Sequence, residues 1–131
     1  MKAVDTNVLV RYLVADDPAQ ASAASRVFES ESIFIPKSVL LESEWVLRSA
    51  YERSPSEIAA AFAALADARE IEIEDERAVR RAIAWFARGL DFADALHLAS
   101  RRQDVEFVTF DKGLVSIARR TGIEGVRKLA S

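Results

Sequence analysis

The chain has 131 residues, of which 50% are hydrophobic and 30% charged, and its net charge is −3. This composition is typical of one compact domain, so we predict a single domain over residues 1–131. The slight excess of acids argues against a protein that binds nucleic acid through a broadly basic surface, but it does not exclude a nuclease whose acids bind metal. Cysteine is absent, which excludes a disulfide framework, a thiolate nucleophile and a cysteine-based zinc site.

The distribution of apolar and charged residues argues against a membrane or secreted protein. No stretch approaches the roughly 20 apolar residues of a membrane span. Charged residues interrupt the N-terminal segment, where a signal peptide needs an apolar core. We therefore expect a cytoplasmic protein with no membrane partner.

Short apolar runs alternate with helical patterns along the whole chain. In chain order we predict a strand at 2–4, helices at 6–14 and 18–30, a strand at 32–35, helices at 39–51 and 55–68, a strand at 71–73, helices at 76–88 and 92–102, a strand at 105–110, a helix at 114–120 and a strand at 126–129. The alternation predicts an α/β fold, with a central, mainly parallel sheet of four to five short strands and helices on both faces.

Four acidic residues lie where apolar runs end or on helices that such runs lead into. Asp5 follows the first predicted strand and Asp111 follows the run 107–110, while Glu42 and Asp94 lie within apolar helices. Parallel strands point their carboxyl ends at one edge of a sheet, where α/β proteins place their sites. Four carboxylates at that edge would bind a hard divalent cation, for which Mg²⁺ or Mn²⁺ is the natural choice.

Several of these acids also have a purely structural explanation, which covers Asp94 less well because its turn is predicted to be buried. Asp5, Asp91 and Asp111 are placed to cap helices. Glu42 lies at the margin of an apolar face and is expected to be at least partly buried, whereas Glu44 is expected to be exposed. If the acids converge, however, two charges about 4 Å apart repel by ~4 kcal/mol at an effective dielectric near ~20, which caps worth about 1 kcal/mol do not offset. Convergence therefore requires a cation or protonated acids.

Other polar residues accompany these acids. Thr6 and Asn7 place two oxygen-bearing side chains beside Asp5 at the positive end of a helix. His97, the only histidine, lies three residues after Asp94, yet its apolar helix favours a packed side chain over a ligand. Three basic residues near the predicted site edge are candidates for phosphate contacts: Arg11, Lys37 and Lys112.

Several segments together resemble a PIN domain, and among PIN domains the VapC toxins of toxin–antitoxin pairs. They are Asp5-Thr6-Asn7 after the first strand, Glu42 in its helix, the segment Asp91-Phe92-Ala93-Asp94-Ala95-Leu96, and Thr109-Phe110-Asp111-Lys112. The likeness covers nearly the whole chain in order.

This resemblance implies a PIN-like three-layer α/β/α sandwich and a Mg²⁺- or Mn²⁺-dependent endoribonuclease that hydrolyses phosphodiesters with activated water. By the same resemblance Asp5, Glu42, Asp94 and Asp111 would hold the metal, supported by Thr6, Asn7 and Thr109, with Asp91 opening its helix. The resemblance to VapC toxins, which usually form homodimers, further implies a homodimer that a VapB-type antitoxin holds inactive.

Other readings of the acids remain open. A receiver-like Mg²⁺-binding signalling domain would need its phosphorylated aspartate at the end of a middle strand, whereas Glu42 is predicted to be helical. A dehalogenase-type phosphatase would need an acid where Asn7 stands. With only four glycines, none clustered, a phosphate-cradling loop is disfavoured. A non-catalytic acidic module that binds a basic peptide is separated from a nuclease by an RNA cleavage assay.

Overall fold

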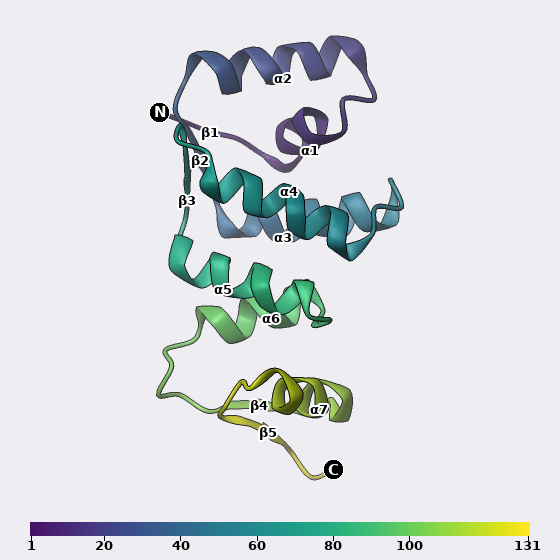
Figure 1. Cartoon of the computed structure of the whole chain (residues 1–131), viewed down its shortest axis with the longest axis vertical. Coiled ribbons are helices and arrows are strands. Elements are labelled where there is room, and N and C mark those ends of the chain that lie inside the picture. Colours follow the sequence, from purple (N-terminus) through teal and green to yellow (C-terminus); the bar gives the residue numbers. More distant parts are fainter. The chain divides into compact units, whose positions relative to one another are not determined.

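The computed structural model describes residues 1–131 and contains seven helices and five strands (Figure 1). The chain divides into two compact units, Met1–Glu76 (unit 1) and Arg77–Ser131 (unit 2). All strand pairing is parallel, and helices separate the strands in sequence. The prediction of an α/β fold with parallel strands is therefore confirmed. No helix is both long and apolar enough to span a membrane.

Unit 1 contains a three-stranded parallel sheet and four helices. Its elements are β1 (Lys2–Ala3), α1 (Thr6–Val14), α2 (Pro18–Ser30), β2 (Ile33–Ile35), α3 (Lys37–Ser49), α4 (Pro55–Asp67) and β3 (Ile71–Ile73). The strand order is β1-β2-β3, with Ile33 opposite Lys2 on one side and Ile71 on the other. Ile33 and Ile35 of the middle strand have no exposed surface, so β2 anchors the core of this unit.

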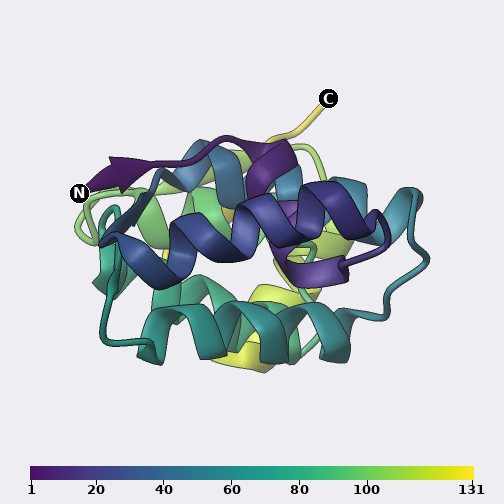
Figure 2. The ribbon, with the colours of Figure 1, turned by 90° about the horizontal axis from the view of Figure 1, so that it is seen from above.

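The helix starts follow the local signals in the sequence. The Asp17 side chain accepts hydrogen bonds from the first turn of α2, and Pro18 occupies the first helical position. Ser54 and Glu57 form a reciprocal capping box at the start of α4. Helix α1 lies beside both α2 and α3 (Figures 1 and 2), and this packing places the start of α1 next to the middle of α3.

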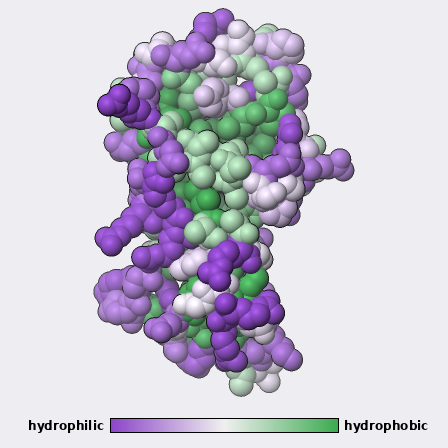
Figure 3. All heavy atoms as spheres, in the orientation of Figure 1, coloured by the Kyte–Doolittle hydropathy of each residue, from purple (hydrophilic) through white to green (hydrophobic).

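Helix α3 buries a stripe at the helical spacing i, i+3, i+4, i+7, formed by Leu40, Ser43, Glu44 and Leu47. Two of the four are polar. The Glu44 carboxylate accepts a hydrogen bond from Arg48 Nε at 2.7 Å, whereas the buried Ser43 hydroxyl has no hydrogen-bond partner. Elsewhere in unit 1 hydrophobic atoms reach the surface between hydrophilic side chains (Figure 3), and the Trp45 side chain of α3 is 58% exposed.

Unit 2 contains a two-stranded parallel sheet and three helices. Its elements are α5 (Glu76–Ala87), which begins at the unit boundary, α6 (Phe92–Ser100), β4 (Phe107–Thr109), α7 (Lys112–Thr121) and β5 (Val126–Lys128). Phe107 lies opposite Val126 in the β4–β5 pair. Phe86 and Phe92 pack edge to face, with ring centroids 5.3 Å apart. The strand predicted at 105–110 is shorter in the structure, and both Val108 within it and Phe110 after it are exposed.

Arg101 holds the end of α6 to the segment that leads into β5. Its Nη1 donates to the carbonyl oxygens of Val105 at 3.0 Å and Gly125 at 2.9 Å, and its Nη2 donates to the carbonyl of Glu124. Gly125 adopts a left-handed conformation with φ +74°. A Cβ atom at Gly125 would lie 3.2 Å from Arg101 Nη1, so the guanidinium occupies the space that a side chain would need.

Candidate active site

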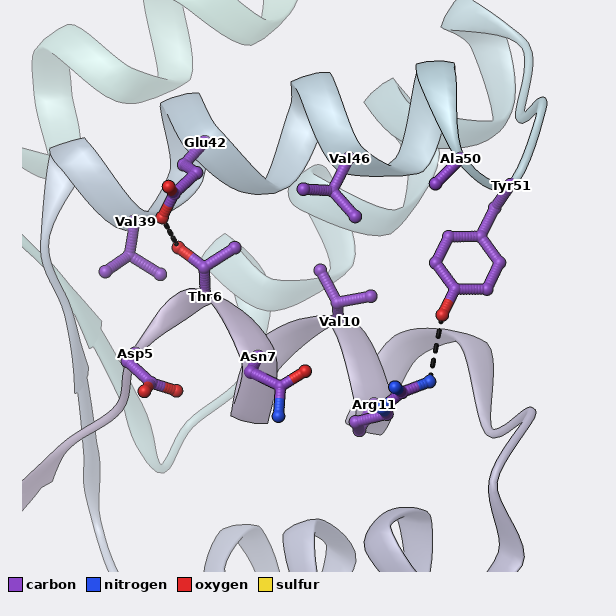
Figure 4. Close-up of a pocket in the computed structure, with 10 residues that line it drawn as sticks. All are labelled: Asp5, Thr6, Asn7, Val10, Arg11, Val39, Glu42, Val46, Ala50 and Tyr51. Carbon is purple, nitrogen blue, oxygen red and sulfur yellow. Dashed lines mark hydrogen bonds between the residues drawn. The ribbon is translucent and has the colours of Figure 1, made fainter.

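Unit 1 has a pocket of about 550 Å³ between α1 and the face of α3 that looks toward it (Figure 4). Polar residues occupy both ends and apolar residues the middle. The lining residues are Asp5, Thr6, Asn7 and Glu42 at one end, Arg11 and Tyr51 at the other, and Val10, Val39, Val46 and Ala50 between them. The pocket therefore combines two carboxylates, an apolar wall and one cation.

Thr6 connects α1 to α3 at the acidic end of this pocket. Its hydroxyl donates a hydrogen bond to Glu42 Oε1, across 36 positions of sequence (Figure 4). The side chain of Glu42 is exposed, and that of Thr6 is half-buried. Because Thr6 is the first residue of α1, the entry of the chain into this helix sets the position of the Glu42 carboxylate.

Asp5 caps α1 in the predicted way. Its backbone is extended, and its Oδ1 accepts a hydrogen bond from the amide of Val8 at 3.0 Å. The cap uses only one carboxylate oxygen, so the other is available to a ligand. Asn7 is exposed at the pocket, two residues along the same helix.

At the other end, Arg11, Asp16 and Tyr51 form a closed network. Arg11 Nη1 donates to Asp16 Oδ1 at 2.7 Å and to the Tyr51 hydroxyl at 2.9 Å, and that hydroxyl donates to Asp16 Oδ2 at 2.9 Å. Arg11 Nε donates to Gln20 Oε1 at 2.7 Å. The hydrogen bond from Arg11 lowers the pKa of Asp16, and the same bond raises the pKa of Arg11, so both groups are charged at neutral pH.

In unit 2, three aspartates lie at the starts of two helices. Asp91 caps α6 by accepting from the amide of Asp94 at 3.3 Å, as the sequence predicted. Asp111 caps α7 by accepting from the amide of Leu114 at 3.0 Å. Asp94 is half-buried in the first turn of α6. Each capping aspartate again uses a single carboxylate oxygen.

These aspartates affect one another electrostatically. Burial raises the pKa of the Asp94 carboxyl, and the charges of Asp91 and Asp111 raise it further. His97, one turn along α6 and exposed, opposes this shift only in part. The raised pKa shows that negative charge on Asp94 is disfavoured in the absence of a cation.

Thr109 fixes the backbone at Asp111, and Gly113 leaves space for its side chain. The Thr109 hydroxyl accepts a hydrogen bond from the Asp111 amide at 3.0 Å, which ties the end of β4 to the start of α7. A Cβ atom at Gly113 would lie 3.2 Å from Asp111 Oδ1, so glycine leaves room for the carboxylate. Thr109 therefore fixes the backbone at Asp111, whereas Thr6 contacts the carboxylate of Glu42 itself.

The candidate acids are not used in ion pairs. Asp5, Glu42, Asp91, Asp94 and Asp111 form no salt bridge with a lysine or arginine, although other acids of the chain do, such as the partners of Lys37 and Arg102. Neither unit by itself brings together three carboxylate or histidine side chains that could hold a metal ion. Unpaired oxygen donors with a free lone pair are the ligands that Mg²⁺ and Mn²⁺ prefer, so the chemistry of these residues fits such a cation.

Two expectations for α3 were wrong. Glu42 is exposed, not partly buried, and Glu44, expected to be exposed, is only 3% exposed. The stripe that begins at Leu40 determines both, because Glu44 lies at i+4 on that stripe and Glu42 does not. Lys37 does not line the pocket, since its amide donates to Glu74 and its ammonium group contacts Asp75.

Sequence reasoning missed Tyr51, which lines the pocket, and Asp16, which pairs with Arg11 at its end. Tyr51 was predicted as the last residue of the helix at 39–51 but follows the end of α3, and Asp16 lies in the loop after α1. The only local signal was Arg11, which the sequence placed near the site edge. An arginine beside an apolar stripe needs an acidic partner, and Asp16 was the nearest acid along the chain.

Comparison with known proteins addresses the identity of the chain. No curated protein and no solved structure matches it significantly. The family model described as PIN domain matches residues 2–120, which include the candidate acids of both units. The chain therefore belongs to the PIN domain family, a family of nucleases.

Proposed function

We propose that this protein is a Mg²⁺- or Mn²⁺-dependent endoribonuclease in which Asp5, Glu42, Asp94 and Asp111 act together as ligands of the cation. In this proposal Thr6 and Thr109 hold Glu42 and Asp111 in place, while Asn7 lies beside Asp5 and contacts substrate or water. Asp91 acts mainly as the cap of α6 and as a second negative charge near Asp94.

One observation carries the proposal. All four acids lie at or near helix starts or on the pocket face of α3, and all four are without basic partners. Asp5 and Asp111 also cap helices, but capping does not explain why none of the four acids pairs with a lysine or an arginine. Burial raises the pKa of Asp94, and the charges of Asp91 and Asp111 raise it further, with only His97 acting in the opposite direction.

The chemistry follows from the donors. A divalent cation at these carboxylates would neutralise charge on the scissile phosphate and activate water for attack. The chain itself contributes the placement of the carboxylates: α1 and α3 present Asp5 and Glu42, and the starts of α6 and α7 present Asp94 and Asp111. Hydrolysis would leave a 5′-phosphate and a 3′-hydroxyl.

We further propose that the protein is the toxin of a VapBC-type pair. Support comes from the resemblance of the segments around Asp5, Asp94 and Asp111 to VapC toxins. As in those proteins, the functional form would be a homodimer, and a VapB-type antitoxin would cover the acidic residues. Its site of action would be the cytoplasm.

The test is cleavage of total cellular RNA by the purified chain with Mg²⁺ or Mn²⁺, followed by sequencing of the new ends. The expected result is defined cleavage sites bearing 5′-phosphates, no cleavage after chelation by EDTA, and no cleavage by Asp94→Asn. Persistent cleavage by both Asp94→Asn and Asp111→Asn would refute the assignment. Binding of a basic peptide without any cleavage would favour the non-catalytic module instead.

A further inference from the structure

The end of the unit 1 pocket that is farthest from the acids has no role in the proposed chemistry. Arg11 and Tyr51 line it, and the apolar wall of Val10 and Val46 separates it from Glu42 (Figure 4). We propose that this end is a binding subsite for a backbone phosphate of single-stranded RNA, with Arg11 as the phosphate ligand. The inference rests on the proposed function for the identity of the polymer.

The guanidinium of Arg11 has donors to spare. Its Nε donates to Gln20, and its Nη1 donates to Asp16 and to Tyr51. These bonds occupy three of the five N–H groups that arginine carries, and the two N–H groups of Nη2 have no partner. The two N–H groups of Nη2 point in different directions, so one of them can donate to a phosphate oxygen while the bonds of Nε and Nη1 stay intact, and the charge of the guanidinium adds to the attraction.

The network also holds these donors in place. Asp16, Gln20 and Tyr51 contact the arginine from the loop after α1, from α2 and from the end of α3. A side chain fixed on several sides loses little further conformational freedom when it binds a ligand. Tyr51 contributes twice, since its hydroxyl accepts from Arg11 and donates to Asp16.

The position of Arg11 relative to the acids suits a polymer. Asn7 and Arg11 are four residues apart and lie on the same side of α1 (Figure 4), and a helix rises about 6 Å over that interval. Asp5 lies at the start of the same helix. A strand running along α1 would place one phosphate near the acidic end and a neighbouring phosphate near Arg11, with sugar or base against the valines.

RNA is favoured over a small anion by the shape of the pocket. Its volume of about 550 Å³ exceeds what an isolated phosphate needs, and its middle is apolar. An apolar wall between an acidic end and a cationic end fits a nucleotide whose phosphates flank a sugar and base. The subsite contacts only the phosphate backbone of the RNA, so it is expected to strengthen binding equally for all RNA sequences.

The experiment measures affinity for a single-stranded RNA oligonucleotide over a range of salt concentrations, in an Asp94→Asn background that prevents cleavage. Arg11→Gln is compared with Arg26→Gln, a matched control on the exposed surface of α2 that makes the same change in net charge. We expect Arg11→Gln to weaken binding about tenfold and to reduce the slope of log K against log salt by about 0.7, the value for one phosphate contact in a single strand. Arg26→Gln is expected to change neither quantity appreciably.

A second variant controls for the possibility that Arg11→Gln fails to fold. Arg11→Gln leaves Asp16 without its cation, so the double variant Arg11→Gln/Asp16→Asn restores neutrality, and circular dichroism checks both. Folded variants whose affinity and salt slope equal those of the parent overturn the phosphate subsite, even if the chain cleaves RNA. Arg11-dependent binding without cleavage by the wild type would keep the subsite and refute the nuclease. If neither the parent nor the wild type binds RNA at any salt concentration, and the wild type cleaves none, both proposals are overturned.

Discussion

The hydroxyl of Thr6 donates a hydrogen bond to the carboxylate of Glu42, and this bond joins the first turn of α1 to the middle of α3. It fixes the one candidate ligand that lies in the middle of a helix and not at or near its start. Outer hydrogen-bond partners of this kind orient metal ligands, and their loss commonly costs 10–100-fold in metal affinity or activity.

We expect Thr6→Ala to reduce the rate of RNA cleavage by about 10–100-fold with little loss of stability. Thr6→Ser, which retains the hydroxyl, is the matched control and is expected to keep most of the activity. Single-turnover cleavage at saturating Mn²⁺ measures both. Equal rates for Thr6→Ala and the wild type would remove this hydrogen bond from the account of the site.

Asp94→Asn is expected to stabilise the metal-free protein while abolishing cleavage. The folded structure raises the pKa of Asp94 through burial and through the charges of Asp91 and Asp111. The folded protein therefore binds a proton at Asp94 more readily than the unfolded chain does. As the pH rises from the unfolded pKa through the folded pKa, this group lowers the free energy of unfolding, and the loss persists at higher pH.

The substitution Asp94→Asn removes this loss of unfolding free energy. We expect a rise in melting temperature of about 4 °C per kcal/mol regained at neutral pH in EDTA, and a gain that vanishes as the pH falls below the unfolded pKa. Asp104→Asn is the control in the same unit, because Asp104 is exposed and paired with Arg102. A melting temperature of Asp94→Asn that stays equal to the wild type across this pH range would show that the repulsion is absent.

The two glycines between α7 and β5 separate two physical effects. Gly122 and Gly125 both have positive φ, so alanine at either position costs about 1 kcal/mol in backbone strain. Only at Gly125 would the new methyl group approach another side chain, at 3.2 Å from Arg101 Nη1, whereas nothing lies within 4 Å at Gly122. We expect Gly125→Ala to lower the free energy of unfolding by more than Gly122→Ala, as measured by urea denaturation. A larger loss at Gly122 would contradict the role given to Arg101.

Ser43 provides a test of the α3 core. Its hydroxyl is fully buried and has no hydrogen-bond partner, so it carries a desolvation cost without compensation. We expect Ser43→Ala to raise the free energy of unfolding by about 1 kcal/mol. Ser49→Ala on the exposed side of the same helix is the control and is expected to stay within about 0.5 kcal/mol of the wild type. Destabilisation by Ser43→Ala would indicate that its hydroxyl is bonded in solution.

Much of the fold could be predicted because its local signals agree with its tertiary packing. Asp17-Pro18 and the capping box from Ser54 to Glu57 place two helix starts within one residue, since each satisfies free amides at its own terminus. The roles of Asp5, Asp91 and Asp111 as caps could be predicted for the same reason. Capping is decided within four residues of sequence.

Long-range features could not be predicted from the sequence. The burial of Glu44 depends on which side of α3 faces the core. That side could not be recognised from the sequence, because two of its four buried residues are polar. The contribution of Tyr51 to the pocket depends on α1 and α3 lying side by side, which no local pattern encodes. The hydrogen bond between Thr6 and Glu42 has the same origin, because it spans 36 positions.

The most direct test of the central claim is a Mn²⁺ titration followed by thermal denaturation, applied to the wild type and to Asp5→Asn, Glu42→Gln, Asp94→Asn and Asp111→Asn. A ligand at 100 times its dissociation constant stabilises the folded state by about 2.7 kcal/mol, so the wild type should show a clear rise in melting temperature that EDTA reverses. If the four carboxylates share a cation, each substitution weakens this response. A flat titration of the wild type, or a full response in both Asp5→Asn and Glu42→Gln, would contradict a site to which all four belong.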